Sequence, residues 1–398
     1  MKKTLMALTV LAVAITPACS SSEAETDDVY RVMISAGLSS VGPLANNAAT
    51  SVLAARAGVE QINNAGGIGG RQVELTVVDD AGEPSTAVTK LRQALTSSGK
   101  PDLYLSSGPS TVSAAVLPIL DQKSVLSFNI APTADSGNPE TFPLNFDLAP
   151  SISSFAAGIV AHAKDTGYRS IGVIHGSSAT GELFGTSLAT AAANAGVAIT
   201  GNEQYDGAAL DMTSQLVRLQ SGRPDVLVID AYGSPLGFIL RDLTKLGWNV
   251  PLIGDVSVAA TELVSSLPPE GLVGTPSVKN LTMQVAASAR FDPSATVTNA
   301  AVEAMAALGS IESTLGVAYN YDALPLVQAA ADAAGSTDPS KIAASLEDPQ
   351  VTAKASTAII PHYSFSPSSH SFDIPVDQLA FVPPSVRVNG QFGGPQQN

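Results

Sequence analysis

The sequence contains a single cysteine, Cys19, among its 398 residues. One cysteine cannot form a disulfide within the chain, and it cannot build a cysteine-rich zinc site or an iron–sulfur cluster. The four histidines are scattered along the chain and never occur with the HExxH spacing of a metalloprotease. The GxSxG element of a serine hydrolase is also missing. These absences argue against an enzyme, and we expect neither a metal nor another cofactor.

Charged residues are also few, at 14% of the chain, and most of them are acidic. The 35 Asp and Glu residues outnumber the 20 Lys and Arg residues, so the formal net charge is −15. This balance argues against nucleic acid or an anionic membrane surface as a partner, because both repel a negative protein. Hydrophobic residues make up 45% of the chain. A chain of this length and composition can bury two separate cores, so we expect two lobes.

The first 19 residues have the pattern of a targeting segment and are set apart from the fold. Lys2 and Lys3 provide a basic start, residues 4–15 are mostly apolar, and Cys19 ends the segment. The apolar run is too short for a permanent membrane span. A cysteine at this place resembles the lipobox of a bacterial lipoprotein; the alternative is an ordinary secretory peptide cut nearby. The lipobox implies a lipid anchor on Cys19, with residues 20–28 as a flexible polar tether.

Short apolar runs alternate with helical patterns along the rest of the chain. Residues 30–36, 171–175 and 225–230 are rich in aliphatic and β-branched side chains and predict strands. Residues 45–63 are typical of the segments in between, because their apolar side chains recur at helical spacing. Strands interleaved with helices of this length predict βαβ units, and therefore an α/β protein with a mostly parallel sheet in each lobe.

Residues 103–118 predict a buried strand, a tight Gly-Pro turn and then a helix that opens at Ser110 or Thr111. The hydroxyl of the Ser or Thr is expected to cap that helix. A helix that starts at the carboxyl end of a parallel strand directs free backbone N–H groups and a partial positive charge outward. Open α/β sheets bind their ligands in that crevice. The stretch is therefore either a seat for an anionic group such as a carboxylate, or an ordinary strand-to-helix turn.

Two further patterns resemble chemical motifs but favour structural roles. The glycine-rich run at residues 64–70 ends a helix and precedes a strand, which is the opposite polarity to a phosphate-binding loop. It is typical of a helix C-cap and turn, where glycine supplies positive φ. Asp79 and Asp80 are adjacent on a strand, so their side chains point to opposite faces and do not form a catalytic pair. We expect a solvated strand end there.

Three segments carry a resemblance to a known family, and they occur in the order that the family has. They are INNAGGIGGRQVEL at residues 62–75, YNYDA at residues 319–323 and FSPSSH at residues 365–370. With these segments the chain resembles the Leu/Ile/Val-binding protein family, the extracytoplasmic solute-binding proteins of branched-chain amino acid-type ABC transporters. The resemblance covers essentially the whole mature chain.

The resemblance implies a type I periplasmic-binding fold. This is an α/β fold with two doubly wound, mostly parallel-sheet lobes joined by a three-segment hinge, and neither lobe is continuous in sequence. Lobe 1 is expected to hold residues 29–149 and 279–361. Lobe 2 is expected to hold residues 150–278 and 362–398.

The resemblance also implies which residues hold the ligand. Ser110, with Thr111 beside it, matches the position that binds a carboxylate in the family, in agreement with the helix start described above. A second carboxylate contact is expected from the loop at residues 127–133, where the register leaves several residues open. On lobe 2, Tyr232 either contacts the ligand or anchors the strand end. Asp255 lies at, or one residue from, the position where the family has an acid that binds the amine. The candidate ligand-binding residues are Ser110, Thr111, Asn129, Ala131, Thr133, Tyr232 and Asp255.

The sequence departs from the family at other positions of the cleft. Ile152 stands where an acid often binds the amine, Asn47 where an aromatic residue is frequent, and Thr180 where a tyrosine is common. A buried ammonium group needs a carboxylate partner, because an unpaired buried charge is costly. The hypothesis is that the ligand offers a carboxylate or amide, and that it carries an amine only if Asp255 faces the cleft.

The function that the resemblance implies is solute binding, without catalysis. The chain would be a lipoprotein of an ABC importer in the bacterial cell envelope, outside the cytoplasm, and would capture its solute by hinge closure. Its partners would be a small-molecule solute, the transporter permease and the membrane through the anchor on Cys19. No nucleic acid is expected, and the chain would be a monomer. The alternative is a ligand-sensing receptor module that reports to a membrane signalling partner.

Overall fold

The structure is a computed structural model that describes residues 29–97 and 99–394. The targeting segment, the anchor residue Cys19 and the tether at residues 20–28 lie outside the described residues. In the part of the chain that is described, no helix is both long and apolar enough to cross a membrane.

The first sheet has five parallel strands in the order β2-β1-β3-β4-β5. They are β1 (Val29–Ala36), β2 (Gln72–Asp79), β3 (Leu103–Ser106), β4 (Leu126–Asn129) and β5 (Asn145–Asp147). β3, β4 and β5 are buried along their whole length. Burial of this kind is typical of parallel strands that have helices on both faces of the sheet.

Helices cover both faces of this first sheet, and the alternation of side chains along β1 shows how. Met33 packs in one core with Leu91 of α2 and Val116 of α3. Val32 and Ile34 point the other way, into the core that contains α1. We call this body lobe 1. Its helices are α1 (Pro43–Asn64), α2 (Pro84–Thr96) and α3 (Ser110–Gln122), and from later in the chain α9 (Thr296–Leu308), α10 (Asn320–Ala334), α11 (Pro339–Leu346) and α12 (Pro349–Thr352).

The second sheet has six strands in the order β11-β10-β9-β8-β6-β7, all parallel to their neighbours except the antiparallel pair of β10 and β11. We call this body lobe 2. Its strands are β6 (Ser170–Gly176), β7 (Ala198–Tyr205), β8 (Val226–Ile229), β9 (Leu252–Gly254), β10 (Leu281–Ala286) and β11 (Leu379–Val382). Its helices are α4 (Ile152–Asp165), α5 (Ala179–Ala195), α6 (Thr213–Ser221), α7 (Ser234–Lys245) and the short α8 (Val256–Ala259). Short 3₁₀ turns are η1 (Glu262–Val264), η2 (Pro276–Val278), η3 (Ala287–Ala289), η4 (Leu315–Val317) and η5 (Val376–Gln378).

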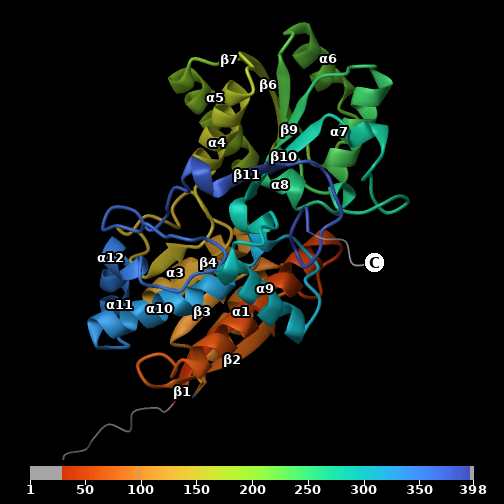
Figure 1. The fold of residues 1–398 in the computed structure, drawn as a ribbon. Coiled ribbons are helices and arrows are strands. Elements are labelled where there is room, and N and C mark those ends of the chain that lie inside the picture. The colour runs from red at the N-terminus through yellow and green to blue at the C-terminus, as the bar shows by residue number, and fades with distance from the viewer. Residues whose placement is uncertain (1–28, 98, 395–398) are drawn as a thin grey trace, which may run out of the picture.

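The two lobes stack end to end, with lobe 2 above lobe 1 in Figure 1. The expected α/β class with two mostly parallel sheets is confirmed. Two of the connections between the lobes run side by side: the N–H of Asp147 donates to the carbonyl of His370 (3.0 Å), and the N–H of Ser151 donates to that of Phe372 (2.8 Å). These bonds tie the first crossing of the chain to the last one.

The predicted boundaries at residues 279 and 362 differ from those in the structure. β10 (Leu281–Ala286) pairs with β9, so the chain returns to lobe 1 only after that strand. Residues 363–372 still pack against lobe 1, where the rings of Phe365 and His370 lie 5.0 and 3.8 Å from that of Phe146. The aromatic side chains hold this segment to lobe 1 until the chain crosses to β11.

The glycine-rich turn after α1 has the predicted backbone, whereas the environment of Asp80 was predicted wrongly. Gly66, Gly67, Gly69 and Gly70 all have positive φ. Asp80 is fully buried, and its carboxylate accepts hydrogen bonds from the hydroxyl of Ser35 (2.6 Å) and the N–H of Gly82 (2.8 Å). The loop that follows covers it, so only Asp79 has the expected solvated position.

Candidate functional site

A cavity of about 370 Å³ lies between the lobes. Lobe 1 contributes residues from α1, the start of α3 and the loop after β4, and lobe 2 contributes residues from α5, α8, β10 and the turn after β8. Segments near the crossings, at residues 149–152 and 314–319, complete the wall. The cavity therefore lies where the carboxyl ends of strands from both sheets meet, which is the usual binding position in open α/β sheets.

Ser110 is the first residue of α3 and lines this cavity. The predicted capping role is wrong, because Pro109 occupies the cap position and no side chain caps the helix. Among the described residues, neither the Ser110 hydroxyl nor the backbone N–H of Ser110 and Thr111 has a hydrogen-bond partner. Free donors at the positive end of a helix are groups that can interact favourably with an anion. The Thr111 side chain itself is exposed and does not line the cavity.

In the loop after β4, only Ala131 of the three candidates lines the cavity, beside Ile130 and Pro132. Asn129 is fully buried, and its amide donates to the Asp147 carboxylate at 2.6 Å, so it ties β4 to β5. Thr133 exchanges hydrogen bonds with Ser136 and closes a turn. Neither Asn129 nor Thr133 contacts the cavity, because local polar partners hold both side chains.

A hydrogen bond across the cavity joins the two lobes at Tyr232. The Asn47 amide of α1 donates to the phenol oxygen of Tyr232 at 2.9 Å, and the Ser313 hydroxyl donates to the other end of that amide at 2.6 Å. Burial raises the pKa of Tyr232 to about 12, against the opposing effect of the Asn47 hydrogen bond, so the phenol stays neutral. Tyr232 lines the cavity, as does Asn47.

Asp255 lines the cavity together with a second carboxylate, Asp230, which sequence analysis did not select. Asp255 is buried and caps α8 by accepting the backbone N–H groups of Ser257 and Val258 at 3.0 and 3.1 Å. The Ser257 hydroxyl lies 2.5 Å from Asp255 and 3.0 Å from Asp230, and its single proton can serve only one of them. Asp230 directly follows β8, two residues before Tyr232, and that position is the signal that could have found it.

The environment of this acid pair disfavours two negative charges. Burial raises the pKa of Asp230, and burial together with the neighbouring Asp230 charge raises the pKa of Asp255 well above its usual range. Among residues 29–97 and 99–394, no Lys or Arg lines the cavity beside them. A cationic group of a ligand would offset both the burial of the carboxylates and their mutual repulsion, because an opposite charge stabilises their ionised forms.

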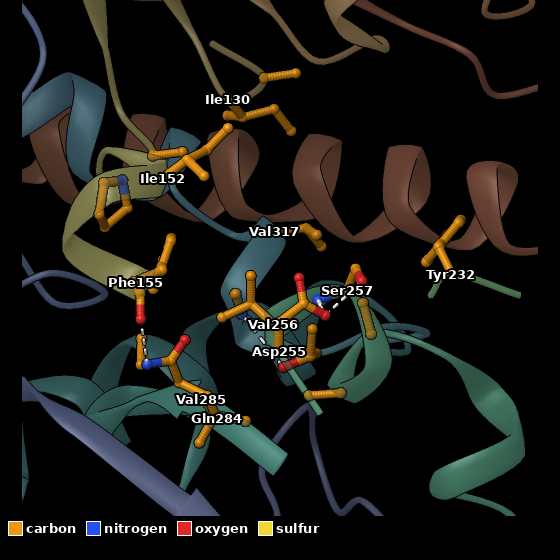
Figure 2. Close-up of a pocket in the computed structure, with 18 of the residues that line it drawn as sticks. Ile130, Ile152, Phe155, Tyr232, Asp255, Val256, Ser257, Gln284, Val285 and Val317 are labelled. Atoms are coloured by element: carbon orange, nitrogen blue, oxygen red, sulfur yellow. Dashed lines mark hydrogen bonds between the residues drawn. The ribbon is translucent and has the colours of Figure 1, made fainter. Parts of the chain in front are cut away.

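Most of the remaining wall is apolar (Figure 2), with side chains from both lobes turned toward the same space. Ile152, Asn47 and Thr180, the three departures from the family pattern, all line the cavity. The labelled apolar side chains are Ile130, Ile152, Phe155, Val256, Val285 and Val317. Val285 and its neighbour Gln284 were missed because no motif marks them and residues 279–361 were assigned to lobe 1. The cavity thus suits a small molecule whose middle is apolar and whose ends are polar.

A family model described as "Periplasmic binding protein" matches residues 35–373. The chain belongs to this family. The match spans both lobes and includes every residue given above as lining the cavity. The family consists of binding proteins, so the expectation that the chain is not an enzyme is confirmed.

Curated relatives resemble the chain over most of its length. The leucine-, isoleucine-, valine-, threonine- and alanine-binding protein of Pseudomonas aeruginosa is 24% identical over 352 residues, which cover 87% of this chain and 89% of that protein. Leu/Ile/Val-binding protein homolog 3 of Brucella melitensis is 25% identical over 327 residues, which cover 80% of this chain and 84% of that protein. The resemblance to the Leu/Ile/Val-binding proteins is therefore confirmed as a distant relationship.

Solved structures share the fold. A periplasmic binding protein type 1 from Bordetella pertussis has a TM-score of 0.71 at 23% identity, with 89% of this chain and 96% of that chain covered. A solute-binding protein of an ABC transporter from Rhodopseudomonas palustris, in complex with 3,4-dihydroxybenzoic acid, has a TM-score of 0.64 at 17% identity, with 80% and 85% covered. At these identities the likeness establishes the fold alone.

Proposed function

We propose that this chain is the extracytoplasmic solute-binding protein of an ABC importer, and that it holds a small carboxylate- or amide-bearing solute between its lobes. The observation that carries this proposal is the cavity of about 370 Å³, which both lobes line and into which α3 opens at Ser110. The donors at Ser110 take the negative or polar end of the solute, and the apolar wall takes its body.

Two classes of solute fit this cavity. Small aliphatic amino acids are one class, which the name of the Pseudomonas aeruginosa relative supports. Aromatic acids are the other, in line with the 3,4-dihydroxybenzoic acid held by the Rhodopseudomonas palustris protein. Asp255 and Asp230 favour the amino acids, because an ammonium group would pair with the buried carboxylates. Ile152 leaves that ammonium without the second acid that the family often places there.

Capture proceeds by closure of the lobes about the three crossings of the chain. Closure brings Tyr232 of lobe 2 against Asn47 of lobe 1, and the solute is then enclosed by residues of both lobes. The closed form presents a single surface to a permease. Cys19 carries the lipid anchor in this proposal, so the monomeric protein works at a membrane surface outside the cytoplasm.

A thermal-shift screen tests the proposal. The mature chain is heated with leucine, isoleucine, valine, threonine, alanine, benzoate, hydroxybenzoates and a set of neutral sugars. A solute present at a hundred times its dissociation constant adds about 2.7 kcal/mol to the stability of the folded state. We expect a clear rise of the melting temperature with at least one amino acid or aromatic acid and none with the sugars. The proposal is contradicted if only the sugars raise the melting temperature, or if none of the solutes does.

A further inference from the structure

Gln284 of β10 places a buried amide in the wall of the cavity. Its side chain is fully buried, yet the amide oxygen Oε1 has no hydrogen-bond partner among the described residues. Figure 2 shows the amide below Phe155, joined to its backbone carbonyl by a dashed line. Buried amide oxygens are nearly always hydrogen-bonded, so this one requires an explanation.

The orientation of this amide is fixed by its other end. The amide nitrogen Nε2 donates to the carbonyl of Phe155 at 3.0 Å, so the oxygen is the atom left for another partner. Gly158, one turn further along α4, makes room for this contact, because a Cβ there would lie 2.7 Å from Nε2. The amide is thus held at its nitrogen, and Oε1 is left without a partner among the described residues.

The partner that fits Oε1 is a neutral donor. A cationic amine has better partners in the carboxylates of Asp230 and Asp255, which line the same cavity. An apolar group placed against Oε1 leaves the acceptor buried and unpaired, which is unfavourable. A hydroxyl group satisfies the acceptor and brings no charge into an apolar wall.

We propose that Gln284 is a specificity-determining residue that accepts a hydrogen bond from a hydroxyl group on the body of the solute. The inference rests on the proposed function and narrows its solute class to hydroxylated acids, with the carboxylate at Ser110 and the hydroxyl at Gln284. This hydrogen bond is expected to give a preference of about tenfold for a hydroxylated solute over the apolar analogue of the same shape.

Matched pairs of solutes test the role of Gln284. The probes are threonine against valine and 3- and 4-hydroxybenzoate against benzoate, with dissociation constants measured by calorimetry on the mature chain. We expect the wild-type protein to bind one hydroxylated member about tenfold more tightly, and Gln284→Leu to lose or reverse that preference. Gln328→Leu is the matched control, because the Gln328 amide also donates to a carbonyl, that of Gly67, but lies away from the cavity. Equal affinities within each wild-type pair, or an unchanged preference in Gln284→Leu, overturn the proposal.

The melting temperatures of the same variants without solute give a second readout, which separates this inference from the proposed function. If Oε1 is an unpaired acceptor, Gln284→Leu removes the unfavourable burial of that acceptor as well as the hydrogen bond made by Nε2. We therefore expect the variant to melt no lower than the wild-type protein. Gln328→Leu loses a hydrogen bond alone and is expected to melt lower. If no probe binds, the proposed function fails; if Gln284→Leu melts as low as Gln328→Leu, the inference about Gln284 fails.

Discussion

Ser110 offers the cavity a hydroxyl and a backbone N–H, and neither has a partner among the described residues. Removing the hydroxyl leaves the backbone donor and the helix end in place. We therefore expect Ser110→Ala to weaken binding of a carboxylate solute by about tenfold without abolishing it. Calorimetry with the solute found in the thermal-shift screen measures this. Thr111→Ala is the control, because that side chain is exposed, and an unchanged affinity in Ser110→Ala would contradict the assignment.

Asp255 and Asp230 make the stability of the solute-free protein depend on pH. Their pKa values are raised in the folded state, so their contribution is present below the ordinary Asp pKa and is lost as pH rises through the raised values. Asp255→Asn removes one of these charges and keeps a residue that caps α8 well. We expect the variant to melt higher than the wild-type protein at pH 7, with the difference shrinking toward pH 4. Melting temperatures of both proteins are measured from pH 4 to pH 8, and a difference between them that does not change with pH would contradict this prediction.

The same variant separates amine-bearing solutes from simple acids. If an ammonium group pairs with Asp255, Asp255→Asn weakens the binding of an amino acid but leaves that of an aromatic acid nearly unchanged. Calorimetry with one solute of each kind measures the difference. Equal losses for both kinds would show that Asp255 acts only through the shape of α8.

At the scale of residues, sequence reasoning succeeded where backbone geometry decides and failed where side chains choose local partners. Ser110, Ala131, Tyr232 and Asp255 line the cavity because each lies within a few residues after the carboxyl end of a strand. Asn129 and Thr133 occupy similar places, but Asp147 and Ser136 hold their side chains. Asp147 belongs to the neighbouring strand β5 and Ser136 to the same loop as Thr133, and no pattern along the chain announces either pairing.

At the scale of elements, the contact between α1 and the turn after β8 connects the lobes. Tyr232→Phe removes the hydrogen bond from Asn47 and keeps the aromatic ring. We expect the solute to dissociate several-fold faster, because the lost bond is made only when the lobes are together. Stopped-flow dissociation measures the rate. Tyr168→Phe is the control, since Tyr168 lies just before β6, at the opposite end of that strand from the cavity, and equal rates in wild type and Tyr232→Phe would contradict a closing role.

The turn after α1 gives a matched pair of glycines. Gly66 and Gly67 both have positive φ, at 103° and 81°. A Cβ on Gly66 would meet nothing within 4 Å, whereas a Cβ on Gly67 would lie 1.9 Å from the carbonyl oxygen of Arg71. We expect Gly66→Ala to cost about 1 kcal/mol of unfolding free energy and Gly67→Ala more than about 2 kcal/mol. Denaturant unfolding measures both, and equal losses would show that the backbone conformation alone matters.

The alternation of strands and helices followed from the sequence, whereas two assignments to lobes did not. β10 was placed in the wrong lobe because its six residues carry no sign of their partner, β9. Residues 363–372 stay with lobe 1 through ring contacts to Phe146, which lies more than two hundred residues earlier. Contacts between residues so far apart in sequence decide where one lobe ends and the other begins, and the local periodicity of the sequence does not reveal them.

At the scale of the whole molecule, the structure consists of two sheets whose strand ends face one cavity, joined by crossings that are tied together. Asp147 stands at this junction: its carboxylate accepts from Asn129, Ser136 and Ser371, so it links lobe 1 to the last crossing. Burial raises the pKa of Asp147 against the effect of these hydrogen bonds. The first and last crossings are therefore connected through the buried Asp147 carboxylate.

If a solute binds between these lobes, filling the cavity must prevent its binding. Ala131→Trp introduces a large ring where Ala131 lines the cavity, while Thr133→Trp introduces the same ring in the same loop outside it. The measurement is the rise of melting temperature that the best solute of the screen produces in each variant. We expect the rise to vanish in Ala131→Trp and to persist in Thr133→Trp; an undiminished rise in Ala131→Trp would contradict the account.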